Sequence, residues 1–290
     1  MNTEKKIGRI DLHMHTSVSD GTDSPKEIIG KVRAAGIDLF SVTDHDAVKG
    51  CDTIRALLKA DDPLFISGIE FSCKDEYGKY HILGYGYDAE AEAIRSIVQY
   101  GHNIRIEKLG MRLEALRDKY GFTFSDSDIA KLYSLDNPGK PHLANLMVRY
   151  GYAKDKSEAF GEYLNRIKLP NANVRPEMAI EGILKSGGIP VLAHPSYGSG
   201  DELYTGDEME ERLKRLIGFG LRGVEAFYSG FSDKLTNEML EFAEKYDLYV
   251  TAGSDYHGSN KLIEIGDVRL DDVSSAPEAL HRFLADVPKR

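Results

Sequence analysis

The chain has 290 residues, of which 41% are hydrophobic, so it is long enough to bury a large core. Its formal net charge of −10 argues against an extended basic surface for nucleic acid, although a short nucleotide at a metal centre stays compatible with it. With only two cysteines, Cys51 and Cys73, no disulfide framework is expected. The polar N-terminus and the lack of a long apolar run predict a cytoplasmic protein that crosses no membrane.

Seven short apolar runs predict β-strands, and helical patterns separate most of them. This alternation is typical of βα repeats that build a parallel sheet. The predicted strands are 9–15, 39–43, 64–71, 79–87, 189–194, 222–228 and 248–254.

The first predicted helix has clear signals at both ends. Ser24 is a suitable N-cap, Pro25 suits the first turn, Glu27 completes a capping box, and Gly36 ends the helix. Three further helices are predicted at 47–60, 207–219 and 232–246.

The stretch 88–177 breaks the alternation, because it contains amphipathic helical segments and no clear strand. We expect a helical insertion subdomain here that caps the substrate, with 1–87 and 178–290 forming the barrel. The alternative is that the stretch holds ordinary barrel helices and a long loop. The amphipathic segments are 89–120, 141–150 and 156–166.

His13 and His15 are two residues apart on the first predicted strand, so their side chains point to one face. Two imidazoles side by side can chelate one metal ion. Taken alone, such a pair is more often two polar residues on a half-exposed strand. The other histidines favour metal binding, because most of them also fall at or near predicted strand ends or in short motifs.

In a βα barrel the C-terminal strand ends meet at one mouth, where ligands distant in sequence come together. One ion needs three or four protein ligands, so nine candidates are too many for a single ion. Two or three divalent ions are therefore expected, with Glu70 as the bridging carboxylate. The nine candidates are His13, His15, Asp20, His45, Glu70, His81, His194, Asp255 and His257.

In this order, the motifs resemble those of the PHP (polymerase and histidinol phosphatase) family. The order of Glu70, His81, a helical insert and His194 is similar to the family's small nucleotide phosphoesterases. The motifs are His13-x-His15-Thr16, Ser19-Asp20-Gly21, Thr43-Asp44-His45, Gly68-Ile69-Glu70, Ala193-His194-Pro195 and Ser254-Asp255-x-His257.

The resemblance implies a distorted (β/α)7 barrel with a trinuclear centre of Mn, Fe or Zn. Some family members have histidine at the position of Asp20, and a carboxylate is an equally suitable ligand for these metals. The implied ligand sets are His13, His15, Glu70 and Asp255 for one ion, Glu70, His81 and His194 for the second, and Asp20, His45 and His257 for the third.

A metal-activated hydroxide would then attack the phosphate, and no serine or cysteine nucleophile is required. Asp44 is expected either to orient a ligand or assist proton transfer, or to hydrogen-bond within a turn. Tyr228 is expected to line the site, and Glu225 to stand behind the ligands. His142 resembles a Pro-His position of the nucleotide phosphatases, which implies a contact with substrate, and a surface histidine near a helix start is the alternative.

Arg105 and Arg112 share one face of the long insert helix and are candidate phosphate contacts, with surface exposure as the alternative.

The expected substrate is a small phosphorylated molecule, foremost AMP, a nucleoside 3′,5′-bisphosphate or the 5′ end of short RNA. Histidinol phosphate, amidohydrolase chemistry and a non-catalytic metal-dependent binding domain are the alternatives. Glu70 stands where amidohydrolases usually carry a bridging lysine.

Overall fold

The computed structural model describes residues 7–170, 172–198 and 202–289. The chain folds into two compact units, and each is described by itself. One unit contains the residues up to Val98 and those from Val174 onward, and the other contains Gln99–Asn173.

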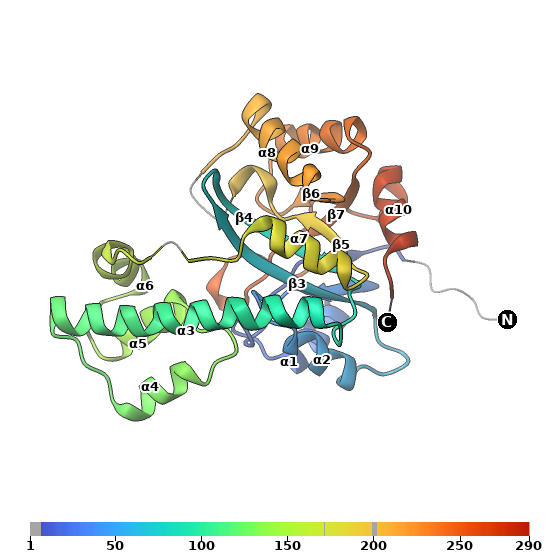
Figure 1. Ribbon diagram of the computed structural model, residues 1–290. Coiled ribbons are helices and arrows are strands. Elements are labelled where there is room, and N and C mark those ends of the chain that lie inside the picture. Colours follow the sequence, from blue (N-terminus) through green and yellow to red (C-terminus); the bar gives the residue numbers. More distant parts are fainter. Residues whose placement is uncertain (1–6, 171, 199–201, 290) are drawn as a thin grey trace. The chain divides into compact units, whose positions relative to one another are not determined.

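The first unit, here called the barrel unit, is built on seven strands that pair in sequence order. The sheet closes on itself, because the N–H of Leu12, just after β1, donates to the carbonyl of Ala252 in β7 at 3.0 Å. This confirms the predicted α/β barrel (Figure 1). The strands are β1 (Ile10–Asp11), β2 (Leu39–Val42), β3 (Leu64–Asp75), β4 (Gly78–Tyr85), β5 (Ile189–Leu192), β6 (Gly223–Tyr228) and β7 (Tyr249–Gly253).

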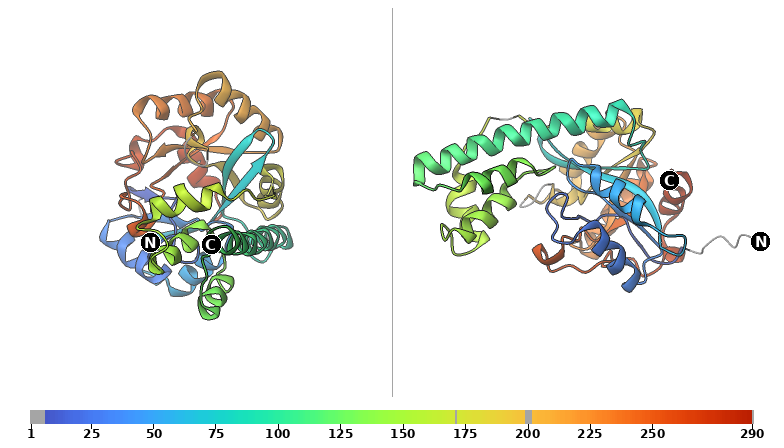
Figure 2. Two further views of the ribbon diagram at one scale, coloured as in Figure 1. Left: turned by 90° about the vertical axis from the view of Figure 1, so that its left-hand side faces the viewer. Right: turned by 90° about the horizontal axis from the view of Figure 1, so that it is seen from below.

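The prediction of a parallel sheet is wrong for β4, which pairs antiparallel with both β3 and β5. Only Glu76 and Tyr77 separate β3 from β4, and so short a connection can join only antiparallel strands. The resulting hairpin is the long cyan pair in Figure 2. Because β4 runs in the opposite direction, its early residues lie at the end of the barrel where the parallel strands finish.

The first strand is shorter than predicted, since regular pairing ends at Asp11. The carboxylate of Asp11 accepts the N–H of His13, which removes that donor from the sheet ladder. The chain nevertheless keeps its direction, because Met14 forms a parallel bridge with Tyr256. Leu12 and Met14 are fully buried on the side away from the histidines, as the alternation predicts.

The capping box of the first helix is confirmed: Ser24 accepts the N–H of Glu27, and the Glu27 carboxylate accepts the N–H of Ser24. The second helix is shorter than predicted. Helices 176–185 and 278–286 were not predicted. The helices of this unit are α1 (Pro25–Ala34), α2 (Lys49–Leu57), α7 (Pro176–Lys185), α8 (Gly206–Gly218), α9 (Asp233–Lys245) and α10 (Glu278–Asp286).

The second unit, here called the helical unit, packs around its own apolar core, which includes Leu109, Leu116, Leu143 and Met147. No strand occurs among its described residues, in agreement with the sequence pattern. Its helix α4 was not predicted. The elements are α3 (Glu92–Tyr120, from residue 99), α4 (Asp126–Tyr133), α5 (Lys140–Arg149), α6 (Lys156–Glu158), a π-helical turn (Ala159–Tyr163) and a 3-10 turn (Leu164–Arg166).

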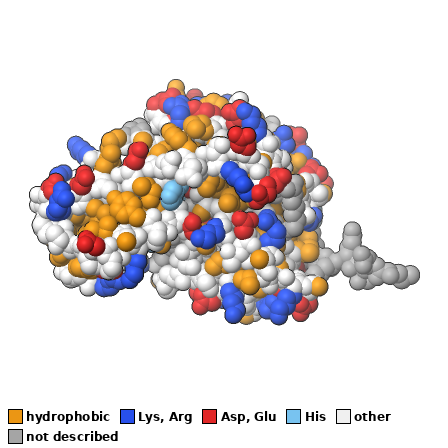
Figure 3. Space-filling view, turned by 60° about the horizontal axis from the view of Figure 1, so that its bottom comes forward, with side chains coloured by type: hydrophobic (Ala, Val, Ile, Leu, Met, Phe, Trp, Pro, Cys, Tyr) orange, Lys and Arg blue, Asp and Glu red, His pale blue; other side chains and the backbone are white. Residues whose placement is uncertain are grey.

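In the part of the chain that the structure describes, every helix is too short or too polar to cross a membrane. On the face drawn in Figure 3, basic and acidic side chains are interspersed on the surface.

Candidate metal centre

All nine predicted ligands belong to the barrel unit and gather at one end of the sheet. His13 and His15 follow β1, and their rings are 5.3 Å apart. Glu70 lies in the interior of β3, which extends beyond its predicted end to Asp75. Asp20 lies in the loop after His15, and the ligands that follow β2, β5 and β7 are His45, His194, Asp255 and His257. His81 reaches the cluster from the first half of β4, because that strand runs antiparallel to its neighbours.

Glu70 lies at the centre of the cluster and is completely buried. One carboxylate oxygen, Oε2, lies 3.3 Å from His13 Nε2, 3.1 Å from His15 Nε2 and 3.2 Å from His45 Nδ1. The other oxygen, Oε1, lies 2.8 Å from His81 Nδ1 and 3.2 Å from His194 Nε2. Five imidazoles therefore converge on one carboxylate, with its two oxygens facing different sets.

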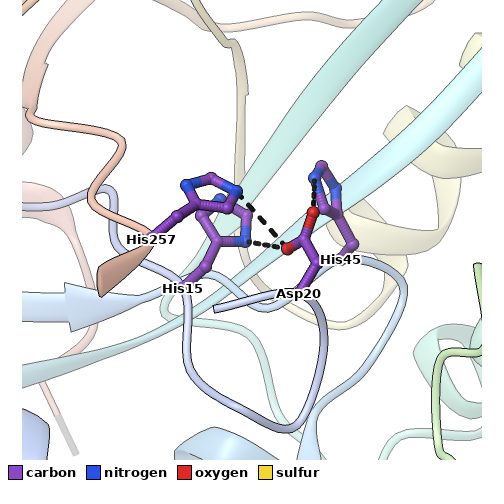
Figure 4. A group of neighbouring side chains, drawn as sticks. All are labelled: His15, Asp20, His45 and His257. Carbon is purple, nitrogen blue, oxygen red and sulfur yellow. Dashed lines mark ion pairs between the residues drawn. The ribbon is translucent and has the colours of Figure 1, made fainter. Parts of the chain in front are cut away.

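Asp20 is the centre of a second group of side chains (Figure 4). Its carboxylate lies 3.3 Å from His257 Nε2, 3.6 Å from His15 Nδ1 and 3.9 Å from His45 Nε2. His15 thus faces Glu70 through one ring nitrogen and Asp20 through the other.

Three sets of side chains offer ligand atoms close enough together to hold an ion. They are His13, His15 and Glu70; His45, Glu70 and His81; and His15, Asp20, His45 and His257. His45 and His15 are shared between sets, which differs from the ligand division expected from the resemblance.

Unsatisfied buried atoms test whether the cluster suits a cation. His13 Nε2, His15 Nε2 and Glu70 Oε2 are buried and have no hydrogen-bond partner, yet they face one another. A buried polar atom without a partner costs about 1–3 kcal/mol, so the folded chain requires a partner at this point. Nitrogen and oxygen lone pairs that converge in this way fit a divalent ion.

The pKa values of the cluster also indicate a site that attracts cations. Although burial raises the pKa of the Glu70 carboxyl, the neighbouring His45, His81 and His13 hold it well below its usual value. Burial lowers the pKa of His15, but Asp255, Glu70 and Asp20 together raise it to about 9. The carboxylates are therefore ionised inside the protein and attract positive charge, whether protons or metal ions.

Glu225, in the middle of β6, supports two ligands from behind. Its Oε1 lies 2.9 Å from His13 Nδ1, and its Oε2 accepts the backbone N–H of His194 at 2.8 Å. An N–H at Nδ1 of His13 that donates to Glu225 leaves Nε2 free to ligate a metal. His194 has a φ of 28°, a strained conformation for a residue other than glycine, and the bond to Glu225 helps to hold it. In the sequence, Glu225 is recognisable as a carboxylate within the otherwise apolar run of β6.

Asp44 is buried, and its carboxylate accepts bonds from the Thr16 N–H, the Thr16 hydroxyl and the Ser19 hydroxyl, each at 2.8 Å. These bonds fold the loop that carries Asp20. Of the two roles considered for Asp44, the observed contacts support the structural one.

The cluster opens into a cavity of about 390 Å³. Besides six of the ligands, Tyr197, Tyr228 and Lys261 line it. The Tyr228 hydroxyl donates to Asp255 Oδ2 at 3.1 Å, and Lys261 forms an ion pair with the same oxygen. Sequence reasoning missed Lys261, which belongs to no motif and follows a short turn after His257.

Arg105, Arg112 and His142 lie in the helical unit. Burial, together with the charge of Arg105, lowers the pKa of Arg112 to about 10. The ring of His142 accepts the N–H of Gly139, and a Cβ placed on Gly139 would lie 3.8 Å from Arg105 Nη1. The three side chains therefore share one neighbourhood, and their contact with substrate stays a prediction.

Comparison with known proteins agrees with this geometry. A 5′–3′ exoribonuclease of Haemophilus influenzae is 28% identical over 95% of this chain and 99% of its own length. A 3′,5′-nucleoside bisphosphate phosphatase of Chromobacterium violaceum is 29% identical over 87% of this chain and 88% of its own length. A solved structure from Bifidobacterium adolescentis, assigned as a metal-dependent phosphoesterase, superposes with a TM-score of 0.80 at 26% identity and covers 96% of each chain.

Barrel, ligand cluster and relatives together define a metal-dependent hydrolase that acts on phosphoester bonds. The profile of the PHP domain family matches residues 11–164, which is more than half of the chain. The chain belongs to the PHP domain family.

Proposed function

We propose that this enzyme hydrolyses a phosphomonoester of a small nucleotide, such as AMP or a nucleoside 3′,5′-bisphosphate, with two or three divalent ions at the barrel mouth. The observation that carries the proposal is the convergence of five imidazoles on the buried carboxylate of Glu70. A mononuclear site takes three or four protein ligands, so one ion leaves most of the cluster unsatisfied.

The three sets of ligand atoms define where ions would be held. One ion belongs with His13, His15 and Glu70, where Asp255 Oδ1 also lies within 3.6 Å of both rings. A second ion would be held by His45, Glu70 and His81, and His194 Nε2 lies 3.2 Å from an oxygen of the same carboxylate. A third belongs with Asp20, His257 and the remaining nitrogens of His15 and His45. These nitrogen and oxygen donors suit Mn, Fe or Zn.

Divalent ions in this place supply a nucleophile at neutral pH by lowering the pKa of water, and they neutralise charge on the phosphate oxygens. The chain keeps the ligands oriented for that chemistry: Glu225 fixes the ring of His13, and Tyr228 holds the outer oxygen of Asp255. The Ser254 hydroxyl accepts the N–H of Tyr256, which supports a structural role for this serine.

The choice of a nucleotide is supported by the relatives, because an exoribonuclease and a nucleoside bisphosphate phosphatase both act on phosphate esters of ribonucleotides or nucleosides. In this proposal, Arg105, Arg112 and His142 recognise a second phosphate, since an arginine fork binds phosphate without a metal.

A phosphate-release screen with Mn²⁺ tests the proposal on AMP, nucleoside 3′,5′-bisphosphates, short 5′-phosphorylated RNA and histidinol phosphate. We expect the highest kcat/KM on AMP or a bisphosphate, and background release after treatment with EDTA. The highest kcat/KM on histidinol phosphate would replace the nucleotide by that substrate, and no release from any ester would refute the phosphatase function.

A further inference from the structure

Lys261 stands out in the mouth cavity because it is the one lysine or arginine among the described residues that line it. Six of the nine lining residues are candidate metal ligands. Tyr197 and Tyr228 offer phenolic hydroxyls, which supply no positive charge. Lys261 is therefore the cation that this wall offers to a substrate in addition to the ions.

The two oxygens of Asp255 separate Lys261 from the metal cluster. Oδ1 lies 3.6, 3.4 and 3.4 Å from nitrogens of His13, His15 and His257. Oδ2 faces the other way and pairs with Lys261 and with the Tyr228 hydroxyl. Lys261 thus neutralises the oxygen that the ligand cluster does not use, and its ammonium group stands at the cavity wall.

The ammonium group keeps donors for a second partner. It has three N–H donors, and Asp255 Oδ2 takes one of them. The Lys261 side chain is 38% exposed, so the other donors can meet a ligand that enters the cavity.

The backbone before Lys261 is tied to the loop that carries Asp20. Asn260 Nδ2 donates to the Asp20 carbonyl at 2.7 Å, and the Ser259 N–H donates to the Thr22 hydroxyl at 2.9 Å. The same loop therefore positions both a candidate metal ligand and Lys261. These two hydrogen bonds fix the position of Lys261 relative to the loop of Asp20.

We propose that Lys261 binds a non-bridging oxygen of the substrate phosphate and makes the site prefer a terminal phosphomonoester over a phosphodiester. A monoester carries a charge of about −1.5 to −2 at pH 7, because its second pKa is about 6. A diester carries a single negative charge. An extra cation at the wall favours the more highly charged ester, and a charge-assisted bond provides the contact. This inference rests on the proposed phosphoesterase function.

The test compares Lys261→Met, which removes the charge at similar length, with Lys261→Arg, which keeps it. Metal-loaded enzymes are assayed on p-nitrophenyl phosphate and bis(p-nitrophenyl) phosphate, and inorganic phosphate binding is measured by calorimetry. We expect Lys261→Met to lower kcat/KM on the monoester by about 10- to 100-fold, the range for a hydrogen bond to a charged group, and to change the diester value by less than about threefold. Phosphate affinity falls by about tenfold or more, and Lys261→Arg restores most of both losses. Lys234→Met, at an exposed position of α9, is the matched control.

Equal losses on both esters, or a loss of metal content in step with the loss of activity, would show that Lys261 acts only through Asp255 and would overturn the inference. Wild-type enzyme that cleaves neither ester would count against the proposed function instead. Phosphate binding then still decides the role of Lys261, because unchanged affinity in Lys261→Met overturns it.

Discussion

Each ionised group in the centre is stable only because another group faces it. Glu70 and Glu225 are both completely buried, and an unpaired buried carboxylate costs several kcal/mol. A cation that faces the carboxylate of Glu70, whether a protonated imidazole or a bound metal ion, offsets this cost. Single substitutions in this network therefore alter metal binding first.

Glu70→Gln tests the bridging carboxylate. An amide carries no charge and cannot serve two ions, so we expect phosphatase activity to fall on the order of 1,000-fold or more with the fold retained. Elemental analysis should show loss of bound metal, and circular dichroism an unchanged spectrum. Glu241→Gln, at an exposed position of α9, is the control. Near-normal turnover with full metal content would contradict the bridge.

Glu225→Gln tests the support behind the ligands. The amide keeps the shape of the side chain but loses the charge that orients the ring of His13, so metal affinity should fall by about 10- to 100-fold. Titration of the metal-free protein with Mn²⁺ measures this directly. At saturating metal, most activity should return, whereas a defect that high metal does not repair would indicate a damaged fold.

At the level of elements, the loop that carries Asp20 depends on α2 as well as on its own residues. Asp44 organises this loop through Thr16 and Ser19, and Gly50 of α2 packs directly against Asp44. A Cβ on Gly50 would lie 1.9 Å from Asp44 Oδ2, so there is no room for a side chain.

Substitution of alanine for these two helix glycines, Gly50 and Gly30, should therefore change the stability of the protein in opposite directions. Gly50→Ala should displace Asp44, destabilise the protein by about 1–3 kcal/mol and weaken metal binding near Asp20. Gly30→Ala in α1, where a Cβ meets nothing within 4 Å, should stabilise the protein by about 0.5–1 kcal/mol. Urea unfolding of both variants measures the difference. Equal stability of the two would show that Asp44 yields easily and that α2 does not support the loop.

For the whole molecule, the acidic net charge and the proposed cation cluster have opposite signs. Bound ions reverse the local charge at the mouth, so an acidic protein can still attract a phosphate. The same ions bind only the folded chain, and they should therefore stabilise it.

Metal content tests this proposal. Protein purified without chelator should contain more than one Mn, Fe or Zn ion per chain by elemental analysis. Removal with EDTA should lower the thermal midpoint by several degrees, since a ligand at 100 times its Kd contributes about 2.7 kcal/mol. Activity should disappear together with the metal. Full activity with a single ion per chain would refute the multinuclear centre.

The helical unit gives a second test on the scale of the whole molecule. Arg105→Ala or His142→Ala should raise KM for a nucleoside 3′,5′-bisphosphate by about 10-fold and leave p-nitrophenyl phosphate unaffected, because only the nucleotide has a second phosphate. Arg117→Ala is the control, since Arg117 lies on the same helix and pairs with the exposed Asp118. Equal effects on both substrates would indicate that these residues support the fold alone.

Much of this protein could be predicted from residues that are neighbours in sequence. Strand positions follow from apolar runs, and the start of α1 follows from Ser24 and Glu27, because capping acts over three residues. The candidate ligands were predicted in the same way, from short motifs at strand ends. These features depend on local periodicity and short-range hydrogen bonds, which are encoded within a few positions of the chain.

Other features depend on strand order and register, and so only the folded chain decides them. The reversed direction of β4 brings His81 to the mouth, although local spacing suggested one more parallel strand. Glu225 meets His13 across 212 positions of sequence, and Lys261 meets Asp255 because a short turn folds it back. The hydrogen bond from Leu12, just after β1, to Ala252 of β7 closes the barrel, and that closure determines which distant side chains become neighbours of the metal centre.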